Sequence, residues 1–233
     1  MKINRELIKK FNNSISINAD LSNYSWFNLG GPAEYFFKPK NESQLIEFLK
    51  SNRANKLKLT ILGAGSNTLI RDKGVKGVVL KLSSGFSQIK LIEKDIIQAG
   101  AATLDRKVSN FAKDNNISNF EFLSCIPGSI GGAVIMNSGC YDNDISKILI
   151  SIRAIDINQC IEREITREEI EFYYRGTNLS KDLIITSVKL KGKIKPKGMI
   201  EKIQNELIEK KKMSQPSQIK TCGSTFKNLS NDK

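Results

Sequence analysis

A glycine-rich loop at residues 63–67 (GAGSN) constrains this chain most, because a strand pattern flanks it on each side. Residues 57–62 alternate apolar and polar side chains before the loop, and residues 77–82 give a second strand pattern after it. Glycine tolerates positive φ and close approach, so such a loop can point several backbone N–H groups at an anion. A Rossmann-type dinucleotide fold also needs a third glycine near Thr68 and then a long helix, and the sequence has neither. The loop therefore predicts a phosphate cradle between strands rather than an ordinary NAD-binding site.

The residues before this loop predict a strand–helix–strand unit. A strand pattern at 33–37 is followed by Asn41, which is placed to cap a helix, with Gln44 in the reciprocal capping-box position. The strand before the loop completes the unit. Residues 1–23 are polar and rich in Asn and Ser after a short amphipathic start, and we expect them to form an N-terminal extension.

Beyond residue 75 the pattern changes to short strands that alternate with turns. A helix is predicted at 103–115, and a smaller one at 166–172 that Thr166 opens with Glu169 three residues later. These elements predict an α+β fold with a mixed or antiparallel sheet. The expected strands of this part cover residues 75–82, 88–93, 95–99, 148–157 and 183–191.

A last helix is predicted from Pro196 to about residue 213. Its apolar residues form one stripe, for which the sequence shows no partner. We therefore expect this helix to be the first element of a further domain. The stripe comprises Met199, Ile200, Ile203, Leu207 and Ile208.

The net charge of +13, from 37 basic and 24 acidic residues, raises the question of nucleic-acid binding. Most of the basic residues are lysines spread along the chain, and no RNA-binding aromatic signature or helix-turn-helix spacing accompanies them. We therefore favour attraction of acidic, phosphate-bearing small molecules and expect no nucleic-acid partner. A basic nucleic-acid-binding protein without a cofactor is the non-enzymatic alternative.

Residue types that the sequence lacks exclude other classes of site. The chain has no histidine, which excludes a His-assisted zinc site and a Ser-His-Asp hydrolase triad. With no apolar run of about 18 residues and no signal-peptide pattern, we expect a cytoplasmic protein that does not bind a membrane. We expect no metal site, and buried or chemically indifferent thiols, from the irregular spacing of Cys125, Cys140, Cys160 and Cys222.

A second glycine cluster lies at residues 126–133. Ser129 is placed to cap a short helix there, and the glycines permit close approach of a ligand. A tight structural turn would explain either cluster alone. A long cofactor that touches both clusters would explain the two together.

Two later segments offer groups for chemistry on a substrate. Arg175 follows two tyrosines at a turn, and a guanidinium held there is suited to bind a carboxylate through two hydrogen bonds, with an ordinary surface arginine as the alternative. Ser224 lies in a glycine-led turn. Without a histidine to activate it, this serine is suited to donate a proton to a developing carbanion.

Taken in order, these segments resemble the UDP-N-acetylenolpyruvoylglucosamine reductase family, the flavoenzymes called MurB. The resemblance covers most of the chain, in the family's order and approximate spacing. It rests on residues 25–31, GAGSN at 63–67, IPGSIGG at 126–132, MNSGCY at 136–141, YYRGTN at 173–178 and GSTFKN at 223–228.

The resemblance implies an α+β two-part FAD-binding domain of the PCMH/vanillyl-alcohol-oxidase type. We expect it at residues 24–194, with a small subdomain at about 24–72 and a large one at about 73–194, after the extension at 1–23. Residues 195–233 are expected to be a remnant of the family's C-terminal substrate-binding domain, truncated at Lys233. Because that domain supplies a glutamate that assists catalysis, an impaired or inactive FAD-binding fragment is one alternative. Another FAD-dependent oxidoreductase of the superfamily is a second.

The resemblance also implies the reaction: reduction of UDP-N-acetylglucosamine enolpyruvate to UDP-N-acetylmuramate in peptidoglycan precursor synthesis. NADPH is the implied reductant, with hydride relayed through FAD. Arg175 would polarise the enolpyruvyl carboxylate and Ser224 would protonate the adjacent carbon, in a monomer whose partner is the UDP-sugar substrate. The implied FAD contacts are Gly63, Ala64, Gly65, Ser66, Asn67, Pro127, Gly128, Ser129, Gly131, Gly132 and Asn137, and the implied substrate contacts are Tyr174, Lys227 and Asn228.

Overall fold

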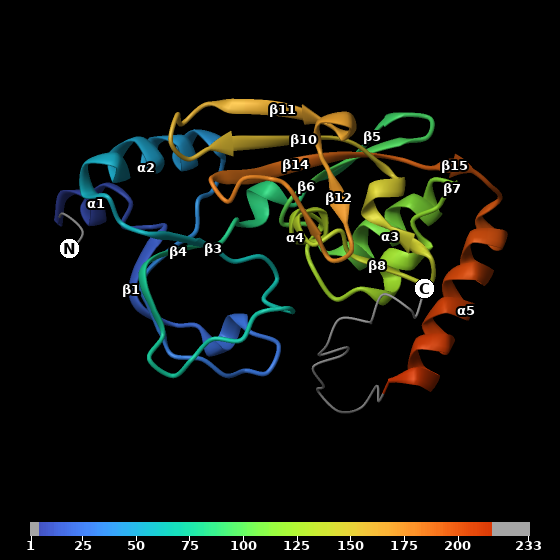
Figure 1. Ribbon diagram of the computed structural model, residues 1–233, viewed down its shortest axis with the longest axis horizontal. Helices are drawn as coiled ribbons and strands as arrows, with labels where there is room; N and C mark the ends of the chain where they lie inside the picture. Colours follow the sequence, from blue (N-terminus) through green and yellow to red (C-terminus); the bar gives the residue numbers. More distant parts are fainter. Residues whose placement is uncertain (1–4, 216–233) are drawn as a thin grey trace.

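The computed structural model describes residues 5–215, which form two main sheets with helices packed on them (Figure 1). In the first sheet, with order β1-β2-β4-β3, β4 is parallel to both of its neighbours and β1 is antiparallel to β2. The segment expected to be an N-terminal extension thus contributes β1, and β4 lies beyond the expected subdomain boundary at residue 72. The strands are β1 (Ile15–Asp20), β2 (Pro32–Phe37), β3 (Leu59–Ile61) and β4 (Val75–Leu80).

Helix α2 (Glu42–Asn55) connects β2 to β3 and covers the sheet together with α1 (Arg5–Lys10). Asn41 caps α2 as expected, since its Oδ1 accepts a hydrogen bond from Gln44 N at 2.9 Å. The reciprocal bond differs from the expected capping box, because Gln44 Oε1 accepts from Lys40 N at 2.7 Å. The rings of Phe37 and Phe48 stack with 4.0 Å between their centres and join the helix to the sheet.

The second sheet is antiparallel, with strand order β11-β10-β14-β6-β5. Helices α3 (Asp105–Asp114) and α4 (Ile130–Ile135) share one buried apolar cluster with it. A mixed first sheet and an antiparallel second sheet confirm the α+β expectation. The strands of the second sheet are β5 (Ile89–Glu93), β6 (Ile96–Gly100), β10 (Leu149–Asp156), β11 (Glu162–Thr166) and β14 (Leu183–Lys191).

Helix α5 (Lys197–Ser214) packs against α3 and against the 3₁₀ helix η3 (Glu121–Cys125) (Figure 1). Ile200 and Gln204 are buried there, and Gln204 Nε2 donates a hydrogen bond to Ser109 Oγ at 3.0 Å. The expectation that its apolar stripe has no partner in the chain is therefore wrong. Of the remaining stripe, Ile203, Leu207 and Ile208 are half-buried and Met199 is exposed.

Short elements complete the described chain. The helix expected at 166–172 is a single 3₁₀ turn, η5 (Arg167–Glu169), although Thr166 and Glu169 do form the capping box. No helix within residues 5–215 has the length and apolar character needed to cross a membrane. Three small antiparallel ladders pair β7 (Ile117–Ser118) with β15 (Lys193–Ile194), β8 (Gly139–Cys140) with β9 (Asn143–Asp144), and β12 (Phe172–Tyr173) with β13 (Gly176–Thr177). The other 3₁₀ helices are η1 (Ser22–Tyr24), η2 (Ser84–Phe86) and η4 (Ile145–Lys147).

Candidate functional site

Three parallel strands of the first sheet end at the same edge, and this edge begins the candidate site. Lys38 follows β2, Lys81 follows β4, and the glycine loop at 63–67 follows β3 after one residue. Lys81 Nζ donates a hydrogen bond to Gly63 O. Ligands commonly bind outside the carboxyl ends of parallel strands. The fold therefore places a glycine loop and a cation together where a ligand is expected.

A cavity of about 370 Å³ opens beside this edge. The ammonium groups of Lys38 and Lys81 lie 5.8 and 6.0 Å from the centre of the Tyr24 ring. Burial, and after it the charge of Lys38, lowers the pKa of Lys81. The two neighbouring cations repel each other, and an anion bound between them would relieve this repulsion. Both lysines would attract such an anion. The cavity is lined by Asn23, Tyr24, Ser25, Trp26, Asn28, Ala64 and Lys81.

The glycine loop packs against residues 24–26 too closely for a side chain. Gly65 has a φ of +75°, and a Cβ atom there would lie 1.8 Å from Tyr24 O. In the same contact, Trp26 N donates a hydrogen bond to Gly65 O at 3.2 Å. The loop is thus held in one conformation against the segment that lines the cavity.

The second glycine cluster is fastened to the segment between β6 and α3. Ile130 N donates to Thr103 O at 2.8 Å, and Gly131 N donates to Ala101 O at 3.0 Å. A Cβ atom on Gly131 would lie 2.8 Å from the Ala101 Cβ, so glycine allows this contact. Ser129 occupies the N-cap position of the short helix α4 as predicted, but its side chain makes no capping hydrogen bond.

The two glycine clusters meet, as a cofactor that touches both requires. A Cβ atom on Gly63 would lie 2.9 Å from Ser129 Oγ, and one on Gly132 would lie 3.6 Å from the same oxygen. On the other side of the turn, a Cβ atom on Gly128 would lie 3.9 Å from Ser66 Oγ. Loops from the first sheet and from the α4 region therefore form one surface. Gly63 and Asn67 are exposed on the first loop, and Gly132 is exposed in the first turn of α4.

Two buried polar side chains lie behind the second cluster. Asp105 N donates to Gly128 O at 3.1 Å, and a Cβ atom on Gly128 would lie 2.5 Å from Asp105 Oδ2. Within the described residues, both carboxyl oxygens of Asp105 and the hydroxyl of Thr103 have no hydrogen-bond partner. Burial raises the pKa of Asp105 to about 8. Thr103 and Asp105 are both 0% exposed, so these polar atoms are enclosed behind the turn.

Arg175 lies in a tight hairpin between β12 and β13. It has a φ of +60°, and its guanidinium carbon lies 4.7 Å from the centre of the Tyr174 ring. One guanidinium nitrogen donates a hydrogen bond to Gly139 O at 3.2 Å. Stacking and this bond fix the plane of the guanidinium and leave its other N–H groups to point elsewhere. The arginine is therefore held in a way that suits a carboxylate clamp, and its contact with a substrate stays a prediction.

Asn137 and Thr177 fasten that hairpin to the end of α4. Asn137 Nδ2 donates to Tyr173 O at 3.3 Å, and its Oδ1 accepts from Ser146 N at 3.2 Å. Thr177 Oγ1 donates to Ile135 O at 3.3 Å. The contacts of Asn137 are thus with protein, and its contact with a cofactor stays a prediction. The structure links the second glycine cluster to Arg175 through α4.

Sequence reasoning names only part of this site. It misses Lys38, Lys81, Tyr24 and Asp105, although Lys81 could have been found from its position directly after a strand parallel to β3. Three predicted residues, Ser224, Lys227 and Asn228, lie outside the described residues 5–215.

Comparison with known proteins agrees with this geometry. The FAD binding domain family matches residues 33–159. The UDP-N-acetylenolpyruvoylglucosamine reductase of Pelagibacter ubique (strain HTCC1062) is 47% identical over 227 residues, which cover 96% of this chain and 74% of the relative.

Solved structures give the same result at the level of the fold. The UDP-N-acetylenolpyruvylglucosamine reductase (MurB) of Thermus caldophilus has a TM-score of 0.79 at 30% identity, and the match covers 92% of this chain and 74% of that one. An alkyldihydroxyacetonephosphate synthase has a TM-score of 0.59 at 11% identity, covering 83% of this chain and 44% of that one, a likeness of fold alone.

Proposed function

The chain belongs to the UDP-N-acetylenolpyruvoylglucosamine reductase family, and on that premise we propose that it reduces UDP-N-acetylglucosamine enolpyruvate to UDP-N-acetylmuramate with NADPH as the reductant. FAD, when bound, supplies a hydride carrier between NADPH and the UDP-sugar. The observation that carries the proposal is the contact between the two glycine clusters beside Lys81. A long anionic cofactor explains why two distant segments meet there.

The residues of this surface fit FAD. Gly63 and Gly132 flank Ser129 Oγ at positions where larger side chains would fill the space. Lys81 offers positive charge to a pyrophosphate, and the Ser129 hydroxyl lies between the two glycine clusters. Backbone amides, a hydroxyl and a cation are the groups that proteins use to bind phosphates.

Arg175 binds the enolpyruvyl carboxylate in this proposal. A guanidinium fixed by Tyr174 and by Gly139 O can present two parallel N–H groups to a carboxylate. Its charge withdraws electron density from the neighbouring double bond and stabilises the negative charge that develops beside the carboxylate as hydride arrives. Arg175 thereby lowers the energy of the transition state more than that of the bound substrate.

Ser224 donates the proton that completes the reduction, and Lys227 and Asn228 bind the substrate from the same segment. A hydroxyl donor suits a chain without histidine. Since these positions lie outside the described residues, the GSTFKN pattern and its resemblance to the family are their support.

The direct test is NADPH oxidation by the purified, FAD-loaded chain with and without the enolpyruvyl sugar nucleotide. We expect oxidation that depends on this substrate and yields UDP-N-acetylmuramate. Oxidation at the same rate without it would contradict the reductase proposal. A chain that cannot be loaded with FAD would contradict the cofactor assignment itself.

Arg175→Lys tests the proposed clamp. We expect kcat/KM to fall about 10²–10³-fold while bound FAD is unchanged, because lysine keeps the charge and loses the planar pair of donors. Arg167→Lys is the matched control, since Arg167 also lies over a ring, that of Phe172 at 4.6 Å, and donates to the carbonyls of Ser146 and Ile170. Equal losses in the two variants would indicate general damage to the hairpin region and would remove Arg175 from this role.

A further inference from the structure

The backbone N–H groups of the glycine loop at 63–67 are unpaired in the described part of the chain. Within residues 5–215, none of the five donates a hydrogen bond. The residue before the loop is bonded, since Leu62 N donates to Leu80 O at 2.8 Å. Successive unpaired N–H groups suit an anion. They can serve one only if the carbonyl oxygens of the same loop are turned elsewhere.

The first of these carbonyl oxygens is held by a side chain. Lys81 Nζ donates a hydrogen bond to Gly63 O. The peptide that follows Gly63 is trans, as are the others that the structure describes, so its C=O and its N–H point in opposite directions. Because Lys81 holds the oxygen, the N–H of Ala64 points away from Lys81.

The carbonyl two residues later is held in the same way by backbone. Trp26 N donates to Gly65 O at 3.2 Å, so the N–H of Ser66 points away from Trp26. Lys81 and Trp26 both line the cavity beside the loop. The two carbonyl oxygens are therefore bonded to the wall of one cavity, and the two N–H groups point away from that wall.

The second glycine cluster approaches the loop from outside this cavity. A Cβ atom on Gly63 would lie 2.9 Å from Ser129 Oγ, and one on Gly128 would lie 3.9 Å from Ser66 Oγ. Neither Ser129 nor Gly128 lines the cavity. An anion that contacts both clusters would thus meet N–H groups of the loop rather than its carbonyl oxygens.

Of the two restraints, the one from Lys81 depends on a single side chain. Its ammonium group lies 6.0 Å from the centre of the Tyr24 ring, and that of Lys38 lies 5.8 Å from the same centre. Within the described residues, neither lysine forms an ion pair with a carboxylate. The bond that the Lys81 ammonium makes is the one to the Gly63 carbonyl, and a charged donor makes such a bond strong.

We propose that Lys81 is a positioning residue that fixes the peptide between Gly63 and Ala64, so that the loop offers N–H groups to the pyrophosphate of FAD. The identity of this anion rests on the proposed function. The effect of Lys81 on the loop does not rest on it. This role acts through the peptide and is separate from the direct attraction between the ammonium group and an anion.

The first experiment measures the loop in the cofactor-free full chain. Amide hydrogen exchange at Trp26, followed by NMR, reports on the bond to Gly65 O in the same loop. We expect Lys81→Met to speed this exchange about 5–50-fold, because the loop loses its other restraint. Lys38→Met removes a charge beside Tyr24 without removing a bond to the loop, and its exchange rate should equal that of the wild type. Unchanged exchange in Lys81→Met, or equal increases in both variants, would overturn the proposal.

The second experiment compares FAD with riboflavin, which has no pyrophosphate, by calorimetry. Lys81→Met should lower the affinity for FAD about 10–10²-fold and leave that for riboflavin unchanged. Lys81→Arg should keep most of the FAD affinity, because a guanidinium can donate to the same carbonyl. Unchanged FAD affinity in Lys81→Met would contradict the role. Equal losses for FAD and riboflavin would indicate general damage and would contradict it too.

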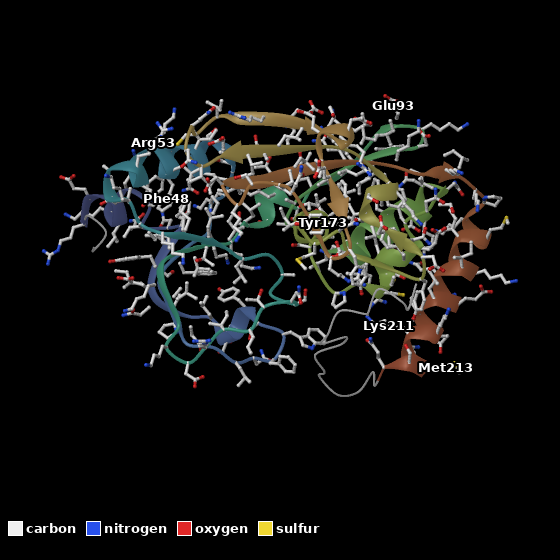
Figure 2. The ribbon with its side chains drawn as sticks, in the orientation of Figure 1. Phe48, Arg53, Glu93, Tyr173, Lys211 and Met213 are labelled. Carbon is white, nitrogen blue, oxygen red and sulfur yellow. The ribbon has the colours of Figure 1, made fainter. Side chains whose placement is uncertain are left out.

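Lys211→Met is the matched control. Lys211 also donates from its ammonium group to a backbone carbonyl, that of Cys125, and its side chain extends from the end of α5 toward the body of the molecule (Figure 2). It lies outside both glycine clusters, so neither FAD affinity nor exchange at Trp26 should change. A loss of FAD affinity equal to that of Lys81→Met would count against a specific role for Lys81. If the wild type binds no FAD, the cofactor assignment fails, and the exchange experiment still decides whether Lys81 holds the loop.

Discussion

Single residues decide how closely the two loops of the site can approach their neighbours. Gly65→Ala adds a Cβ atom 1.8 Å from Tyr24 O at a φ of +75°. We expect this variant to lose about 1–3 kcal/mol of unfolding free energy and most of its bound FAD, because backbone atoms must move to relieve the contact. Thermal unfolding and the flavin absorbance of the purified protein measure the two effects.

Gly198→Ala is the matched control for that change. Gly198 lies in the first turn of α5, and a Cβ atom there would meet nothing within 4 Å. We expect the unfolding free energy of this variant to rise by about 0.4–1 kcal/mol, because alanine restricts the unfolded chain and favours the helix. Similar losses of FAD in both variants would show that the cradle does not depend on Gly65.

Asp105 predicts a pH dependence of stability. Its pKa is raised by burial from 3.8 to about 8, so between these values the folded protein holds a proton that the unfolded chain has released. The unfolding free energy should therefore fall as pH rises through this range. Asp105→Asn removes the ionisation. At pH 8 we expect the unfolding free energy of the cofactor-free variant to exceed that of the wild type by as much as about 5 kcal/mol.

Denaturant titrations of the cofactor-free protein at several pH values measure this difference. Asp72→Asn is the control, since Asp72 is exposed, and its stability curve should follow that of the wild type. A constant offset between Asp105→Asn and the wild type across the pH range would contradict the prediction.

At the scale of elements, the sequence predicts the type of most segments well. The strand expected at 183–191 has those bounds in β14, and the helix expected at 103–115 is α3. The helix expected at 166–172 is a 3₁₀ turn, because the capping box satisfies the first turn and the chain then extends into β12. A cap can start a helix but cannot supply the packing that continues it.

The candidate site, too, is predictable from the sequence only in part. Glycine loops are visible in the sequence because each needs a particular backbone, whereas Lys81 and Asp105 have ordinary sequence surroundings. Their importance depends on which strands are neighbours and on which loop covers the start of α3. Such long-range pairings are set by the packed fold and not by local propensity.

The hairpin that holds Arg175 gives a prediction at this scale. Asn137→Ala removes the hydrogen bonds to Tyr173 O and from Ser146 N, and we expect a loss of about 1–3 kcal/mol in unfolding free energy. If Asn137 mainly positions the hairpin, kcat should fall while FAD affinity changes little. Titration with FAD beside steady-state kinetics separates the roles, and a large loss of FAD affinity with normal kcat at saturating FAD would favour direct contact with the cofactor.

At the scale of the whole molecule, the candidate FAD site joins loops attached to two different sheets. The loop after β3 belongs to the first sheet, and Ser129 precedes α4 on the second. The two parts also share apolar packing, since Ile155 and Ile184 belong to the same core cluster as Phe37 and Phe48. A ligand that touches both loops should therefore stabilise the molecule as a unit.

FAD should raise the unfolding midpoint and protect both loops from hydrogen exchange together. At a free concentration about 100 times Kd, binding contributes about 2.7 kcal/mol, roughly 5–10 °C for a chain of this size. Exchange should slow at residues 59–67 and at 127–135, while β5, at the far edge of the second sheet, serves as the internal control. Protection confined to one loop would mean that the cofactor contacts only one cluster, and a shared ligand would then no longer explain why the two clusters meet.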